Sequence, residues 1–197
     1  MLKIECVWRE LLYQAIEKHQ ANFTITNLAH KFKLSTSLIS HALTPLRQLG
    51  IINIGKNKSS IIDTERLLFF WATRRNLKRD IIYQTYSPLS SFEREALLPP
   101  TVTPTTYSAY RFYYNEPPAD YENIYFYGYQ LAEIKKRFPE NLKKTANLFI
   151  LKPDPYLKNY QRIPTAQIFV DLWNLSDWYA KDFSDALLLK IKEKIGL

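Results

Sequence analysis

The chain has 197 residues, of which 46% are hydrophobic and 15% aromatic, enough to bury one large core or two small ones. It has no apolar run near the ~18 residues of a membrane span and no start typical of a signal peptide, so we expect a cytoplasmic protein without a membrane partner. The single Cys6 excludes an internal disulfide and a multi-cysteine zinc site, and His19, His30 and His41 do not have the spacing of metal ligands. We therefore expect neither a metal nor a cofactor.

The formal net charge of +8 suits a polyanionic partner. Residues 1–66 contain nine Lys and Arg against five Asp and Glu, a balance of +4. Residues 67–197 contain eighteen against fourteen, also +4. The first third of the chain thus carries half of the excess, which favours contact with nucleic acid there.

The first elements are predicted to be two helices with a short strand between them. Apolar residues recur with helical spacing from Ile4 to Ala15 and predict a helix over residues 3–19. Residues 22–25 break this pattern and predict a short strand. Thr26 suits the N-cap of a second helix over residues 27–32.

Residues 34–50, LSTSLISHALTPLRQLG, organise this part of the chain. Wound as a helix, they have one apolar side, with Ser35 suited to the N-cap and Gly50 to the left-handed residue that ends the helix. Pro45 either kinks this helix, because its ring removes the bond to the carbonyl of His41, or begins a fresh turn capped by the threonine before it.

The opposite side of this helix is small and polar and contains no acid. A helix that faces only solvent usually mixes Glu with Lys, whereas a helix that lies against phosphates and base edges excludes carboxylates. An ordinary helix with one buried side is the alternative. We predict that the helix enters a major groove, with these DNA-binding candidates: Thr36, Ser37, Ser40, His41 and Thr44, and Arg47 for a phosphate.

A basic hairpin is predicted directly after this helix. Residues 51–54 and 60–63 predict two strands joined by a turn over residues 55–59. Lys56 and Lys58 at its tip would each neutralise about one phosphate, although a solvated turn also favours Lys. Two helices, a polar-faced helix, a glycine and a basic hairpin, in this order, predict an N-terminal winged helix-turn-helix over residues 1–66.

The segment ITNLAHKFKLSTSLISHALTPLRQLGIINI resembles winged-helix transcriptional regulators of bacteria and archaea. Residues 25–29 are similar to the start of their second helix, residues 35–43 to their recognition helix, and residues 46–52 to its end and the first wing strand. The resemblance implies DNA binding. Thr36 and His41 stand where many of these regulators carry Arg or Lys, which is a departure from Arg-driven base readout.

Residues 67–197 alternate predicted strands and helices, which indicates a small mixed α/β domain and an α+β chain overall. We expect strands over residues 81–86, 123–127 and 146–151. Two helices are expected to be capped by Thr64 and by Thr105 or Thr106, and others to begin at Ser90 or Ser91, Leu131, Pro164 or Thr165, and Asp182 or Ser184. Residues 99–106 contain three prolines and four threonines and predict an irregular loop. The basic cluster Arg74, Arg75, Lys78 and Arg79 is predicted to be a solvated helix end.

We predict no catalytic residues. The chain has only four glycines and no phosphate-binding glycine loop, and every histidine lies in the first 41 residues, away from any Ser–acid partner. A nuclease or nucleotidyltransferase targeted by the winged helix is an alternative, with Asp120, Glu122 and Asp171 as its acids. The surroundings of Asp171 are apolar, which is more typical of a hydrogen-bonded structural carboxylate. A protein-interaction module, with its tyrosine-rich second half as the interface, is a further alternative.

The second half also carries a resemblance. TTYSAYRFYY, NIYFYG, ANLFIL and IPTAQIFVDLWN, in this order, resemble the abortive-infection antitoxin regulators (AbiEi-like), in which a loop leads into a helix with a Q-x-x-x-D-L core. That core is here Gln167, Asp171 and Leu172. The resemblance implies a repressor of its own operon, which also encodes a nucleotidyltransferase-like toxin, and a second domain that neutralises this toxin.

Together these features predict a sequence-specific regulator of transcription that binds double-stranded DNA, an autorepressor of antitoxin type. One short helix reads few base pairs, so we expect a homodimer on an inverted-repeat operator.

Overall fold

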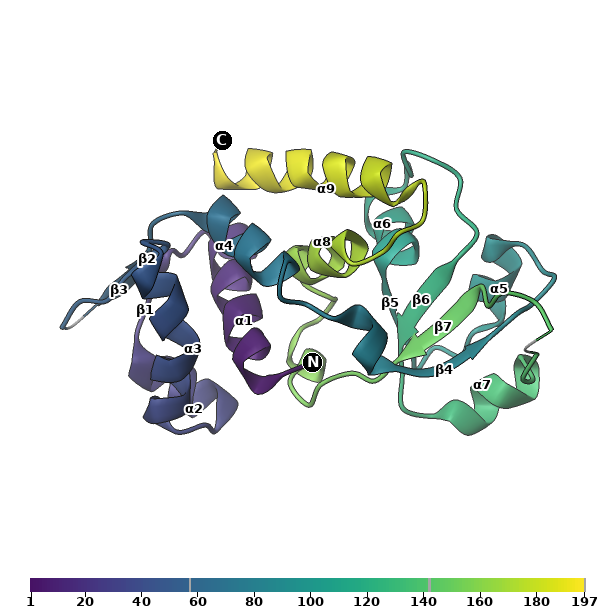
Figure 1. Ribbon diagram of the computed structural model, residues 1–197, viewed down its shortest axis with the longest axis horizontal. Coiled ribbons are helices and arrows are strands. Elements are labelled where there is room, and N and C mark those ends of the chain that lie inside the picture. Colours follow the sequence, from purple (N-terminus) through teal and green to yellow (C-terminus); the bar gives the residue numbers. More distant parts are fainter. Residues whose placement is uncertain (57, 142, 197) are drawn as a thin grey trace.

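The computed structural model describes residues 1–56, 58–141 and 143–196 and has an α+β fold. A β-hairpin lies at one end of its longest axis and a larger sheet at the other, with helices between them (Figure 1). Asn57, in the predicted basic turn of the hairpin, is outside the described residues.

The chain begins with the long helix α1 (Lys3–Glu17), whose apolar side chains are buried as their spacing predicts. The short strand β1 (Asn22–Phe23) and the helix α2 (Ile25–Phe32) follow. The predicted N-cap of α2 is wrong, because Thr24 and not Thr26 caps this helix. The Thr24 hydroxyl accepts the N–H of Asn27 at 3.1 Å, so α2 begins two residues earlier than its apolar pattern indicates.

Helix α3 (Thr36–Gln48) confirms the helix predicted over residues 34–50. The Ser35 hydroxyl caps it by accepting the N–H of Leu38 at 3.2 Å. The helix continues through Pro45, and the Thr44 hydroxyl donates to the carbonyl of Ser40 at 2.8 Å instead of capping a new turn. Of the two alternatives for Pro45, the structure therefore excludes the fresh turn and has the proline inside a single helix.

Gly50 ends α3 as predicted. Its φ is +68°, a left-handed conformation that costs a residue with a side chain more than it costs glycine. Its N–H donates to the carbonyl of Arg47 at 3.0 Å, and the N–H of Ile51 donates to the carbonyl of Leu46 at 2.9 Å. This pair of bonds satisfies two carbonyls of the last turn and directs the chain into the next strand.

The predicted hairpin is confirmed by the strands β2 (Ile52–Asn53) and β3 (Ser59–Ile61), which pair antiparallel. Strand β3 also pairs antiparallel with β1, so a small sheet has the order β1-β3-β2. Through this sheet the hairpin is attached to the segment between α1 and α2.

Helix α4 (Thr64–Ala72) follows the hairpin. Thr64 was expected to cap it, but the cap is Asp63, whose carboxylate accepts the N–H of Arg66 at 2.8 Å. The 3₁₀ turn η1 (Leu77–Asp80) then leads into the second sheet.

The second sheet has the strand order β4-β7-β6-β5. Its members are β4 (Ile81–Thr85), β5 (Thr103–Thr105), β6 (Ile124–Tyr127) and β7 (Leu148–Leu151). β6 and β7 are parallel, and the other two pairs are antiparallel. Strand β5 lies within the stretch that we predicted to be an irregular loop, so that prediction is wrong there. Pro104 is compatible with β5 because this strand stands last in the order, where one side of its backbone needs no ladder bond.

The remaining helices lie beside this sheet or between it and the N-terminal helices (Figure 1). They are α5 (Ser91–Leu97), α6 (Thr106–Tyr114), α7 (Leu131–Arg137), α8 (Thr165–Trp173) and α9 (Ala180–Ile195), with a 3₁₀ turn η2 (Leu157–Asn159). Helix α9 begins at Ala180, ahead of the predicted Asp182 or Ser184.

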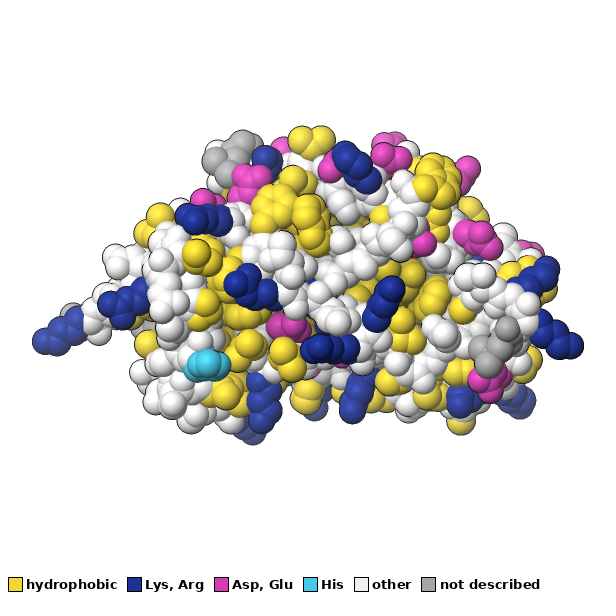
Figure 2. All heavy atoms as spheres, viewed as in Figure 1, with side chains coloured by type: hydrophobic (Ala, Val, Ile, Leu, Met, Phe, Trp, Pro, Cys, Tyr) yellow, Lys and Arg dark blue, Asp and Glu magenta, His cyan; other side chains and the backbone are white. Residues whose placement is uncertain are grey.

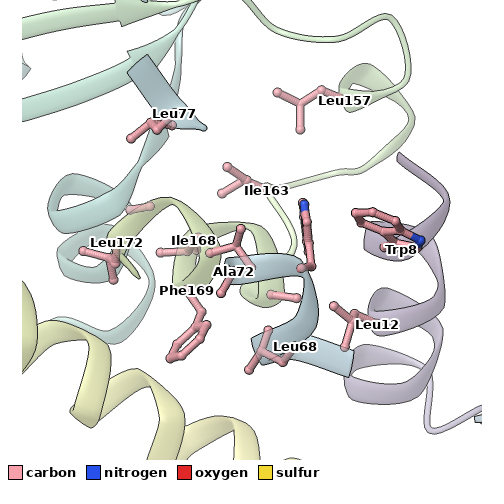
Figure 3. Close-up of a cluster of buried hydrophobic side chains, with 14 of the residues drawn as sticks. Trp8, Leu12, Leu68, Ala72, Leu77, Leu157, Ile163, Ile168, Phe169 and Leu172 are labelled. Carbon is pink, nitrogen blue, oxygen red and sulfur yellow. The ribbon is translucent and has the colours of Figure 1, made fainter. Parts of the chain in front are cut away.

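Helices α1, α4 and α8 share one hydrophobic core (Figure 3). Trp8 and Leu12 of α1, Leu68 of α4 and Phe169 of α8 are among its buried side chains. The predicted boundary after residue 66 falls inside α4. Side chains from residues 1–66 and from residues 67–197 both contribute to this core. No helix of the described residues is long and apolar enough to cross a membrane.

Candidate nucleic-acid interface

Helix α3 is fixed to the molecule by its apolar side. Ile39, Ala42, Leu43 and Leu46 are buried. In addition, the indole Nε1–H of Trp8 in α1 donates to the carbonyl of Ala42 at 2.8 Å. The orientation of α3 about its own axis is therefore set by α1, and its polar side faces outward.

The structure exposes every residue that we predicted as a DNA contact. On α3 these are Thr36, Ser37, Ser40, His41, Thr44 and Arg47, and on the hairpin they are Lys56 and Lys58. The six α3 side chains lie on the one side of this helix that the core leaves free, and the hairpin lies at the same end of the molecule (Figure 1). The predicted site is thus a single exposed surface.

The sequence around this surface is free of acids over a long stretch. Residues 18–62 contain no Asp and no Glu. They contain six cationic residues, all exposed: Lys18, Lys31, Lys33, Arg47, Lys56 and Lys58. A phosphate backbone that approached α3 and the hairpin would meet no carboxylate from this segment.

The acids that precede this stretch are turned inward. Glu5 and Glu10 of α1 are only 3% and 1% exposed. Glu10 accepts hydrogen bonds from the Tyr160 hydroxyl at 2.7 Å and from the ammonium of Lys31. Glu17 is half-buried and accepts the N–H of Thr165 at 2.7 Å. The exposed charge of the N-terminal part is therefore more positive than its formal balance.

The sequence did not reveal this inward placement. Acids between apolar residues of a helix usually mark its solvated side, and nothing in the pattern of α1 shows that it is covered by α3 on one side and α8 on another. In Figure 2 the acidic side chains gather mainly along α9 at the top, whereas Lys side chains extend from the hairpin tip at the left.

Arg75 corrects the prediction that the basic cluster 74–79 is solvated. It is only 5% exposed, and its Nε–H donates to the carboxylate of Asp171 at 3.1 Å. Its Nη1 lies 2.7 Å from a carboxylate oxygen of Asp80 and 3.8 Å from one of Glu5. Arg75 therefore joins η1 to α1 and α8 and is not free to contact nucleic acid, while Arg74, Lys78 and Arg79 are exposed as predicted.

Asp171 is fully buried and hydrogen-bonded, as its sequence surroundings indicate. Its carboxylate accepts the Tyr127 hydroxyl at 2.6 Å, the Thr105 hydroxyl at 2.8 Å and the side-chain amide of Gln167 at 3.2 Å. Burial and the adjacent Asp171 carboxylate raise the pKa of Tyr127 well above its ordinary value, so this hydroxyl keeps its proton and remains a donor.

The acids of the enzyme alternative have different surroundings, because Asp120 and Glu122 are exposed whereas Asp171 is in the core. Within residues 1–56, 58–141 and 143–196, no three His, Cys, Asp or Glu side chains are grouped as metal ligands would be. Gln167 and Asp171, two residues of the Q-x-x-x-D-L core, instead belong to the buried polar network around Arg75.

A scan against protein-family models, a search of curated proteins and a search of solved structures each gave no match to this chain.

Proposed function

We propose that residues 1–66 form a winged helix-turn-helix and that the protein is a sequence-specific regulator of transcription that binds double-stranded DNA. The observation that carries this proposal is the exposed, acid-free side of α3 beside a hairpin with Lys56 and Lys58 at its tip. The order α1, β1, α2, α3, β2, β3 with β3 paired between β1 and β2 supports it, because a recognition helix and a wing need this arrangement to reach one duplex.

The chemistry of α3 suits base edges and phosphates at different positions. The side chains of this helix that can donate to and accept from base edges in a major groove are Ser37, Ser40, His41 and Thr44, with Thr36 beside them on the first turn. Arg47 on the last turn of α3 is the phosphate contact of this helix, and the two hairpin lysines contact the adjacent backbone. A second copy related by a two-fold axis would place a second α3 about one helical turn away, on an inverted repeat.

The proposed regulator is an autorepressor of antitoxin type, with a nucleotidyltransferase-like toxin as its protein partner. This part rests on the resemblance of the second half to abortive-infection antitoxin regulators. A second candidate function is binding of a protein with an acidic surface, which a basic segment far from the hairpin would complement. The net +4 of residues 67–197 is concentrated in residues 131–152, where six Lys and Arg stand against two Glu, and α7 in this segment lies at the end of the molecule away from the hairpin (Figure 1).

The test is selection of DNA by the intact protein from random 30-base-pair duplexes, followed by fluorescence anisotropy with the enriched sequence. We expect an inverted repeat that binds more than a hundredfold tighter than a scrambled duplex, since specific sites commonly exceed non-specific binding by about 10³ or more. Failure to bind any duplex at low salt would contradict the proposal. A protein-interaction role would then be favoured.

A variant pair isolates the surface of α3. Replacing Ser40 and His41 together by Ala is expected to remove the preference for the inverted repeat. The control replaces Lys136 and Lys143, exposed residues at the opposite end of the molecule, by Ala. This control should leave the preference for the inverted repeat unchanged.

A further inference from the structure

A hollow of about 910 Å³ opens on one face of the second sheet, next to η1 and the connection between α8 and α9. Its size is within the ~300–1,000 Å³ that small-molecule sites commonly have. In Figure 2 hydrophobic side chains are visible in this region, between the sheet and the α8–α9 connection. The proposed DNA-binding surface does not include this hollow.

The floor of the hollow is aromatic. Gln84, Phe149 and Tyr125 stand opposite one another on β4, β7 and β6 and therefore share one face of the sheet. The rings of Phe149 and Tyr125 are stacked, with centroids 4.5 Å apart and planes 8° from parallel. Ile82, 38% exposed, lies beside them. Because these two rings stack face to face across neighbouring strands, they present their edges to the hollow. An aromatic ring laid over these edges would have the favourable edge-to-face arrangement and would remove apolar surface from water.

Two lysines and two acids line the rim of the hollow, and the lysines are the groups that could hold an anion. Lys78 and Lys135 line it, and neither forms an ion pair with the part of the chain that the structure describes. Of the two acids at the rim, Asp177 already accepts the Tyr107 hydroxyl at 2.9 Å and the side-chain amide of Asn123 at 2.9 Å. Glu140 is exposed, and its negative charge weakens the attraction of the two lysines for an anion.

We propose that this hollow binds a small planar aromatic anion, with the ring on the Phe149–Tyr125 floor and the negative group between Lys78 and Lys135. A ligand in this site would also touch segments that connect the two halves of the chain. Lys78 is in η1, whose Asp80 pairs with Arg75 and with the N-terminal ammonium of Met1.

On the other side of the hollow, Asn174 donates to the carbonyls of Ala72 and Val170 at 3.1 Å and 3.0 Å. A ligand in the hollow therefore contacts both segments that position α1, and α1 positions α3. Regulation of DNA binding by the ligand rests on the proposed function, whereas the binding site itself does not.

The binding test uses isothermal titration calorimetry of the full chain, without DNA, with indole-3-acetate as the probe and tryptamine as its cationic counterpart. We expect indole-3-acetate to bind and tryptamine to bind at least tenfold more weakly. Lys78→Ala and Lys135→Ala should each weaken indole-3-acetate about tenfold, the usual size of one charge-assisted contact. Glu140→Gln should strengthen it, and Gln84→Trp, which fills the floor, should abolish it.

Lys136→Ala is the matched control, since Lys136 is an exposed residue of the same helix α7 but does not line the hollow. The proposal is overturned if indole-3-acetate does not bind at millimolar concentration, if it binds no better than tryptamine, or if Lys136→Ala weakens it as much as Lys135→Ala. All of these lysines are exposed, so their variants are expected to fold, which circular dichroism will show.

The regulatory step is tested separately, by anisotropy of a bound duplex with and without saturating indole-3-acetate. A change in DNA affinity that Lys135→Ala suppresses supports regulation, and unchanged affinity contradicts it. Loss of DNA binding under all conditions would contradict the proposed function instead, and the calorimetric result on the hollow would still stand.

Discussion

The guanidinium of Arg9 in α1 binds the carboxylate of Asp154, 145 residues later in the chain, through two parallel hydrogen bonds of 2.6 Å and 2.8 Å. Both residues are buried, and Arg9 also donates to Gln167 at 3.3 Å. Burial opposes ionisation of Asp154, but the hydrogen bonds and the charge of Arg9 outweigh it and lower the pKa of this carboxyl. The pair therefore ties the helix that holds α3 to the loop before α8.

Replacement of Arg9 by Met is expected to lower the free energy of unfolding by about 3–5 kcal/mol, because it leaves the Asp154 carboxylate buried without its partner. The double variant Arg9→Met, Asp154→Leu should recover most of this loss, since two apolar side chains need no pairing. Urea denaturation followed by circular dichroism measures both. Equal losses in the single and the double variant would show that the pair is not the origin of the effect.

The lysines of the hairpin should act through charge alone. With Lys56 and Lys58 both replaced by Ala, we expect weaker binding to every duplex and a slope of log K against log salt reduced by about two, because two phosphate contacts and their released counterions are lost. Filter-binding titrations from low to moderate salt measure the slope. A slope equal to that of the unmodified protein would exclude the hairpin from the interface.

His41 should instead act on sequence preference. His41→Ala is expected to relax discrimination at one base position of each half-site, by about 1–3 kcal/mol, while binding to non-specific DNA stays nearly unchanged. Anisotropy with a panel of single-base variants of the operator measures this. Uniform weakening on every duplex would place His41 against the backbone rather than a base edge.

Glu17 is expected to cost stability at neutral pH. Burial raises the pKa of its carboxyl, more than the N–H of Thr165 and the charges of Lys194 and Arg162 lower it, so the folded state disfavours the ionised form. Glu17→Gln should therefore raise the free energy of unfolding at pH 7. This gain should disappear below the unfolded-state pKa of about 4.3, where Glu17 is protonated in both states.

Urea midpoints at pH 7 and pH 3.5 measure the effect, with Glu193→Gln, an exposed acid of α9, as the control. A gain of the same size at both pH values would mean that ionisation of Glu17 is not its cause.

Local sequence signals predicted the fold where one residue controls one feature. Ser35 and Gly50 fixed both ends of the α3 region because a cap and a left-handed turn each need a specific chemistry. The same reasoning failed where two possible caps were adjacent, since Asp63 caps α4 in place of Thr64. Both side chains can accept an N–H bond, so the path of the backbone decides between them. The exposed side of α3 was predictable for the same local reason, since its periodicity identifies the buried side.

Features that depend on distant partners could not be predicted. Nothing in the sequence near Arg75 shows that Asp171, Asp80 and Glu5 surround it, so this arginine looked like a solvated cation. Pro104 and its neighbouring threonines looked irregular because the strand they form depends on pairing with β6. The positive charge of the surface around α3 was underestimated likewise, since the burial of Glu10 depends on Tyr160.

The position of α1 between α3 and α8 limits how this protein could be taken apart or recombined. A shortened version that stops at residue 66 would expose the apolar side chains of α1 that pack against α4 and α8, so we expect it to aggregate. Transplanting α3 and its hairpin onto another scaffold would require a redesigned first helix. A protein that combined this N-terminal part with a different second half would need different residues on the side of α1 that faces α8.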